Sequence, residues 1–143
     1  MIEEFTGVIG IVFLRGEPNK FALIHNNKTG NITLPAGGRE EGEDLSEDSL
    51  KREIKEETGL AFEDFKIIST GIVHEFVYNS KKVDRAGMTA KQPVYLVESK
   101  KEELNPEDSD SEFYGWYNFE EVLDKLTFDD SKEIFKRAVE FIK

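Results

Sequence analysis

The chain has 143 residues, of which 30 are acidic and 19 are lysine or arginine, and its formal net charge is −11 at pH 7. Such a surface argues against non-specific binding to nucleic acid or anionic membranes, because both require an excess of basic side chains. The chain has no cysteine, which excludes disulfides and thiolate metal or redox sites. We expect one domain over residues 1–143, located in the cytoplasm, because no signal sequence or membrane-spanning stretch is recognisable.

Apolar runs bounded by turn residues predict a series of strands. The glycine pair Gly37 and Gly38 directly follows the third of them. The predicted strands cover residues 6–14, 20–25, 32–35, 66–69, 72–78, 93–98 and 113–117.

A helix is predicted between Ser46, a suitable N-cap, and Gly59, a suitable C-terminal stop. Leu50 and Ile54 are four residues apart and give this helix a buried side. Two further helices are predicted over residues 119–126 and from residue 127 onward. Strands mixed with three helices predict an α/β fold.

Three glutamates share one side of the first predicted helix. At 100° per residue, Glu53, Glu56 and Glu57 fall within an arc of roughly 100°. Like charges three and four residues apart destabilise an isolated helix, and a cation would reverse that effect. Oxygen ligands suit a hard ion such as Mg²⁺ or Mn²⁺. The alternative is a solvated acidic face on an acidic protein.

The residues around these glutamates resemble a known motif. Residues 38–60 resemble the Nudix box, G-x5-E-x7-R-E-U-x-E-E-x-G-U, in which U is aliphatic, and residues 52–60 match it at every specified position. One position departs from the motif, because Asp44 stands where the box has glutamate and Glu43 precedes it. Either Asp44 fills this role with a shorter side chain, or Glu43 fills it from a shifted backbone.

This resemblance to the Nudix hydrolases implies a mixed β-sheet sandwiched between helices, an α/β/α arrangement. It also implies hydrolysis of a nucleoside diphosphate linked to a further group. By the same resemblance Glu53, Glu56 and Glu57 hold Mg²⁺ or Mn²⁺, with the Gly37 carbonyl as an extra ligand. The ion would neutralise phosphate oxygens and orient a water for in-line attack on phosphorus.

Other residues are candidates for supporting roles in catalysis. Arg52 lies one helical turn before Glu56 and is expected to orient its carboxylate. The general base is either Glu53 or Glu56, or a glutamate from a later loop. Glu112 is the candidate for that later base or for a late metal ligand, and its alternative is a solvated loop acid.

Basic residues are candidates for binding the phosphates of the substrate. Arg39 follows the glycine pair, and Lys81 and Arg85 belong to a basic stretch over residues 80–91 that suits a polyphosphate tail. The alternative for this stretch is a solvated hairpin loop. Four aromatic residues are compatible with stacking on a base, but core packing is the more common role at strand positions: Tyr78, Tyr95, Tyr114 and Trp116.

Two resemblances point to different substrates. Residues 93–98 and 112–133 resemble the C-terminal part of the Nudix diadenosine tetraphosphate hydrolases, whereas Pro35-Ala36-Gly37 resembles ADP-sugar pyrophosphatases. A nucleoside triphosphate pyrophosphatase also fits a chain of this length, and a non-catalytic nucleotide-sensing module is the alternative to an enzyme. Because the three glutamates of residues 52–60 are present, we expect an enzyme rather than a sensing module. Its expected substrate is a small nucleotide. We expect the protein to be a monomer or a homodimer.

Overall fold

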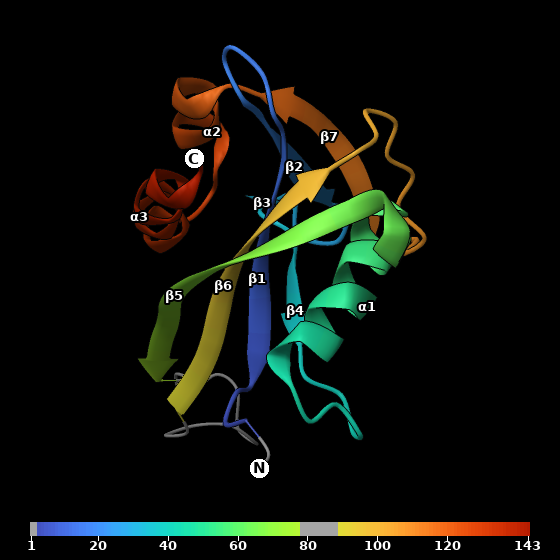
Figure 1. The fold of residues 1–143 in the computed structure, drawn as a ribbon, viewed down its shortest axis with the longest axis vertical. Helices are drawn as coiled ribbons and strands as arrows, with labels where there is room; N and C mark the ends of the chain where they lie inside the picture. Colours follow the sequence, from blue (N-terminus) through green and yellow to red (C-terminus); the bar gives the residue numbers. More distant parts are fainter. Residues whose placement is uncertain (1–2, 78–88) are drawn as a thin grey trace.

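Figure 1 shows the computed structural model of the protein, which describes residues 3–77 and 89–143. Among these residues, no helix is long and apolar enough to cross a membrane. The strands are β1 (Gly7–Leu14), β2 (Lys20–Asn26), β3 (Ile32–Thr33), β4 (Ala36–Gly38), β5 (Phe65–Val77), β6 (Thr89–Ser99) and β7 (Ser111–Tyr117). The helices are α1 (Ser46–Thr58), α2 (Phe119–Lys125) and α3 (Asp129–Ala138), with short 3-10 turns η1 (Phe62–Asp64) and η2 (Val139–Phe141).

The strands form one mixed sheet. Its main order is β3-β2-β1-β6-β5, while β4 pairs with β1 and β7 pairs with β2. β1 and β6 run parallel, and the other pairs are antiparallel. In Figure 1, α1 lies on one side of the sheet, and α2 and α3 lie on the other. The predicted mixed sheet between helices is therefore confirmed.

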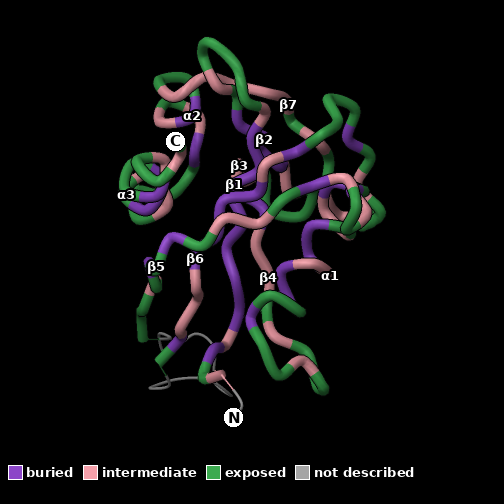
Figure 2. Tube along the Cα trace, in the orientation of Figure 1, coloured by how far each residue is buried: buried purple, intermediate pink, exposed green. Residues whose placement is uncertain are grey.

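Two apolar clusters hold the helices to the sheet, and alternation along β1 contributes to both. Ile9, Ile11 and Phe13 belong to the cluster that packs α2 and α3, while Val8 and Val12 belong to the cluster that contains Leu50 and Ile54 of α1. The buried trace in Figure 2 runs along β1 between these two clusters. Gly10 allows α1 to approach closely, because a Cβ there would lie 3.0 Å from the Ile54 side chain. The helix that carries the predicted metal-binding glutamates is thus packed directly on the central strand.

The start of α1 corrects one sequence-based prediction. Ser46 is not the N-cap, because it is the first helical residue, and Leu45 occupies the cap position without a side-chain cap bond. Instead, the Glu3 carboxylate accepts a hydrogen bond of 2.8 Å from the Ser46 N–H. The buried Ser46 hydroxyl lies 2.5 Å from the Tyr95 hydroxyl of β6. The Asp48 carboxylate accepts a local bond of 3.2 Å from the Leu45 N–H, so a local acid and a distant segment together satisfy this helix terminus.

Two strand predictions also change. The predicted strands at residues 66–69 and 72–78 are, as far as the described residues reach, one strand, β5, with a register shift between Ser69 and Val73 in its pairing with β6; residue 78 lies outside the described residues. Gly71 adopts φ 74° within that shift, so this glycine forms a bulge rather than a turn. β4 was not predicted, because its three residues become a strand only by pairing with β1. At the start of α2, reciprocal bonds between Asn118 and Glu121 form a capping box.

Candidate active site

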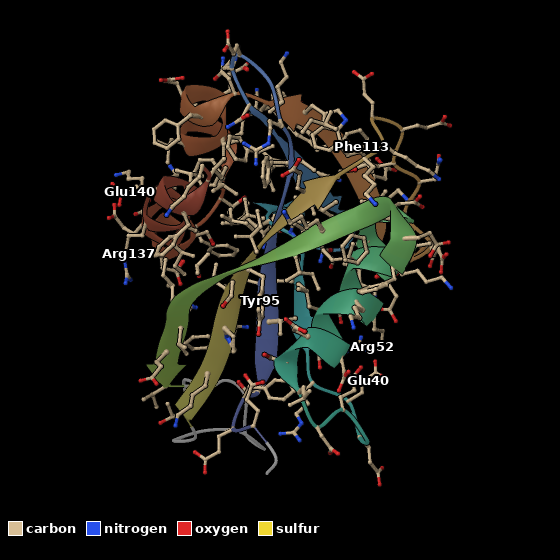
Figure 3. All side chains as sticks on the ribbon, in the orientation of Figure 1. Glu40, Arg52, Tyr95, Phe113, Arg137 and Glu140 are labelled. Atoms are coloured by element: carbon tan, nitrogen blue, oxygen red, sulfur yellow. The ribbon has the colours of Figure 1, made fainter. Side chains whose placement is uncertain are left out.

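Arg52 is the centre of an ionic network on the outer side of α1. Its guanidinium lies 2.9 Å from the Glu40 and Glu43 carboxylates, 2.5 Å from Glu53 and 3.4 Å from Glu56. Figure 3 shows Arg52 and Glu40 next to one another beside this helix. The hydrogen bonds that Arg52 donates to Glu43 and, to a lesser extent, to Glu53 raise the pKa of Arg52 above its usual value. One cation thereby orients four carboxylates, including the Glu56 pairing expected from the helical spacing.

The structure gives Glu43 and Asp44, the two candidates for the first glutamate of the motif, different surroundings. Glu43 accepts bonds from Arg52 at 2.9 and 3.1 Å and from the Ser49 hydroxyl at 2.7 Å, whereas Asp44 is exposed. The bonds from Arg52 lower the pKa of Glu43 to about 2. These contacts favour Glu43 for the role of the first glutamate of the motif, and that role stays a prediction.

Of the predicted metal-binding glutamates, Glu53 is buried and Glu57 is half-buried. Burial raises the pKa of Glu53 to about 7, with bonds from Arg52 acting in the opposite direction. Burial also raises the pKa of Glu57 to about 8, and the nearby charge of Glu53 adds to that rise. The Glu57 carboxylate accepts a hydrogen bond of 3.0 Å from the Ala36 N–H of β4. Two adjacent carboxylates with raised pKa values form a site where added positive charge is favourable.

Gly37 leaves room for this carboxylate pair. A Cβ at Gly37 would overlap the carboxylate of Glu53, so the close approach of β4 to α1 requires glycine. Gly37 pairs with Val8, and its carbonyl oxygen would lie 2.6 Å from a Cβ at Gly7, so this oxygen faces β1. The Gly38 carbonyl instead accepts a bond of 2.5 Å from Arg52. The Gly37 carbonyl as a metal ligand stays a prediction.

The described residues contain no group of three histidine, aspartate or glutamate side chains already converged around one point. The reason is visible at Arg52, which draws Glu53 and Glu56 toward its own guanidinium, while Glu57 bonds to β4. The donor set nevertheless fits a hard divalent ion, because it consists of carboxylate oxygens beside a backbone without a side chain.

Glu112 lies away from this cluster. It is exposed and pairs with His25 in the β2–β7 ladder. The next residue, Phe113, packs against the α1-side cluster, so Glu112 points to the opposite face of the sheet. Its role as a base or late ligand stays a prediction.

Arg39 is held by the N-terminal segment and by its own loop. Its guanidinium donates to the Glu43 carbonyl at 2.7 Å and the Glu3 carbonyl at 3.3 Å, and its Cζ lies 4.4 Å from the centre of the Phe5 ring. These contacts give Arg39 a structural role, and its phosphate contact stays a prediction. Lys81 and Arg85 fall at residues 78–88, outside the described residues.

Sequence reasoning missed two acids near the cluster. Glu40 pairs with Arg52, and Asp108 lies close enough to Glu57 for its charge to raise the pKa of that residue further. The backbone N–H groups of Glu107 and Asp108 both donate to the Glu56 carbonyl, at 2.8 and 3.0 Å. This loop is irregular and carries no periodic pattern, so only the fold brings it to the end of α1.

A cavity of about 620 Å³ lies between β4, the described end of β5 and the start of α3. Ala36, whose N–H bonds to Glu57, is part of its wall. The exposed rings of Phe76 and Phe128 provide apolar surface. The polar groups in the wall include His74, which lies 3.3 Å from Asp130. The volume suits a small organic ligand, and the shared wall places such a ligand beside the acid cluster.

Comparisons with known proteins show the family of this chain. The NUDIX domain family model matches residues 5–138, which cover the whole sheet and all three helices. The chain belongs to the Nudix family. Membership assigns it to hydrolases that act on phosphorus-containing anhydrides. No curated protein matches the sequence.

Solved Nudix structures share the fold at low sequence identity. The E. coli dihydroneopterin triphosphate pyrophosphohydrolase has a TM-score of 0.76 at 11% identity, covering 96% of this chain and 99% of that one. A C. elegans Ap4A hydrolase binary complex has a TM-score of 0.75 at 16% identity, covering 97% and 98%. The NUDIX domain of Shewanella oneidensis NrtR, complexed with ADP ribose, has a TM-score of 0.71 at 15% identity, covering 100% and 91%. At these identities the likeness concerns the fold alone.

Proposed function

We propose that this Nudix chain is a divalent-metal-dependent pyrophosphohydrolase that cleaves a nucleoside diphosphate linked to another group. The preferred substrates are dinucleoside polyphosphates and nucleoside triphosphates. The observation that carries the proposal is the pair Glu53 and Glu57, whose pKa values are raised because burial disfavours charged carboxylates, even though Arg52 pairs with Glu53. A cation that bridges these carboxylates to an anionic phosphate chain would offset the free-energy cost of keeping them charged.

Glu53, Glu56 and Glu57 would hold the Mg²⁺ or Mn²⁺, and Gly37 would leave the space they need. Nudix hydrolases generally require divalent ions, which supply charge neutralisation at phosphate oxygens and activation of a water. Arg52 keeps the Glu56 carboxylate directed along α1, and Glu43 in turn keeps Arg52 in place. Glu53 or Glu56 would take the proton from the attacking water, and Asp108, whose charge raises the pKa of Glu57, is a further loop acid for that role.

The cavity beside β4 supports a nucleotide substrate. Its apolar rings suit a base and its polar groups suit base edges or ribose hydroxyls, while the Ala36 wall would direct the phosphates toward the acid cluster. Among known ligands of similar structures, dihydroneopterin triphosphate and Ap4A both contain a phosphate chain. ADP-ribose is the second candidate, favoured by the Pro35-Ala36-Gly37 sequence and by the ADP-ribose complex of a similar fold.

Incubation with nucleoside triphosphates, dinucleoside polyphosphates and ADP-ribose, each with Mg²⁺ and Mn²⁺, tests the proposal, with products resolved by chromatography. We expect metal-dependent cleavage of a phosphate-chain substrate. Glu56→Gln should abolish cleavage and leave the fold intact, because the Glu56 side chain is 42% exposed. Cleavage of ADP-ribose alone would reject the preferred substrate class. Tight nucleotide binding without any cleavage would favour a sensing module.

A further inference from the structure

A second hollow lies between α1, the η1 turn and the start of β5, with a volume of about 440 Å³. It lies on a different side of α1 from the acid cluster. Lys51, which lines the hollow, is roughly 160° around the helix axis from Glu53. This lysine-rimmed hollow is therefore separate from the candidate active site.

The floor of the lysine-rimmed hollow is apolar. Phe62 is 58% exposed, and its ring meets the buried Phe65 ring edge-on at 5.8 Å. Ile67 continues the apolar surface and packs against the α1-side core. An exposed aromatic side chain beside further apolar surface offers a platform for a planar ligand.

The rim is basic, although the chain carries a net charge of −11. The Lys51 ammonium lies 4.3 Å from the centre of the Phe62 ring, and the Lys100 ammonium donates to the Glu63 carbonyl at 3.1 Å. Within the described residues, neither of them nor Lys66 has a carboxylate within 4.0 Å, whereas the neighbouring Lys101 is paired with Asp64 at 3.2 Å.

Lysines outnumber carboxylates in the wall of the hollow. Among the described residues that line it, Glu47 supplies one carboxylate against three lysines. Two further carboxylates lie nearby, but each is paired, Asp64 with Lys101 at 3.2 Å and Glu98 with Arg15 at 2.8 Å. Salt screens acidic residues beyond about 10 Å, so the lysines of the wall favour an anion here.

We propose that the lysine-rimmed hollow binds a nucleoside monophosphate at a site separate from the acid cluster. The base packs on Phe62 and Ile67, and the phosphate lies among the three lysines. The apolar floor favours this ligand over free phosphate, and the cavity volume is that of a small-molecule site. The proposal goes beyond the hydrolysis of phosphate chains and does not depend on it.

The test is a titration of the metal-free protein, kept in EDTA, with AMP and with inorganic phosphate. Backbone amide chemical shifts are followed by NMR. We expect saturable shifts with AMP at residues 62–67 and 100, and weaker binding of phosphate. AMP shifts confined to residues 52–57, or no saturable shift at millimolar AMP, would overturn the proposal.

Variants make the test specific. Phe62→Ala and Lys66→Gln should each lower AMP affinity about tenfold, while Glu47→Gln should raise it by removing a repelling charge. Lys55→Gln is the matched control, because Lys55 is an exposed lysine of α1 that does not line the hollow. Unchanged amide spectra away from the hollow establish that each variant folds. Equal affinity across all four variants would refute the site, whether or not the enzyme cleaves phosphate chains.

Discussion

Glu43 and Arg52 are joined by two hydrogen bonds, from Nε to Oε2 at 2.9 Å and from Nη2 to Oε1 at 3.1 Å. The Glu43 side chain is 15% exposed, so water replaces these bonds poorly. This pair connects the loop before α1 to the glutamates that we propose hold the metal.

The first prediction concerns this pair. Glu43→Gln keeps the shape of the side chain but removes its charge, so Arg52 should shift and kcat should fall by roughly 10–100-fold. Asp44→Asn is the matched control and should leave kcat near its original value, because Asp44 is exposed. Steady-state kinetics of both variants distinguish the two residues. A larger loss of kcat in Asp44→Asn than in Glu43→Gln would show that Asp44 acts as the first glutamate of the motif.

The second prediction concerns the glycine pair. Gly37→Ala should displace the Glu53 carboxylate and lower Mn²⁺ affinity and activity by about 10–100-fold, because the added Cβ overlaps that group. Gly38→Ala should have little effect, since the nearest atom to its Cβ would be the Thr6 carbonyl oxygen at 3.9 Å. Calorimetric titration with Mn²⁺ measures the difference. Equal affinity in the two variants would show that Glu53 does not need the space at Gly37.

The third prediction concerns pH. The pKa values of Glu53 and Glu57 are raised in the folded protein to about 7 and about 8. Their contribution to the free energy of unfolding is complete below about pH 4.5 and is lost as pH rises through the raised values. We therefore expect the Tm of the metal-free protein to fall from about pH 5 to about pH 8.5, with a smaller fall in the double variant Glu53→Gln, Glu57→Gln.

Divalent ions should counteract this loss, because they compete with protons for the same carboxylates. The rise in Tm on adding Mn²⁺, measured by thermal denaturation, should therefore be larger at about pH 8.5 than at about pH 5. A rise of equal size at both pH values would argue against ion binding at these glutamates.

The fourth prediction concerns the distant cap of α1. Glu3→Ala removes the acceptor for the Ser46 N–H and should reduce the free energy of unfolding by about 1 kcal/mol. Glu4→Ala is the control, because the Glu4 side chain is 88% exposed and lies 3.6 Å from Lys91; such a pair contributes little. Urea denaturation of both variants makes the comparison. An equal loss in both would mean that Glu3 does not cap the helix.

Several features followed from the sequence, because they depend on local geometry. Helical spacing alone placed Glu53, Glu56 and Glu57 on one side of α1, and Gly59 ends that helix with φ 77°, as a glycine allows. The predicted strand over residues 20–25 and the predicted helix over residues 119–126 also match β2 and α2 closely. Each of these patterns requires only neighbouring residues to determine where a side chain points.

The remaining features required the tertiary structure. The choice of Glu43 over Asp44 depends on the path of a loop, the contacts of Arg39 depend on the N-terminal segment, and the direction of Glu112 depends on the register between β2 and β7. The nearness of Asp108 to Glu57 arises because the loop bonds to the end of α1. Loop paths and strand registers are set by contacts between residues far apart in the chain, which no local pattern encodes.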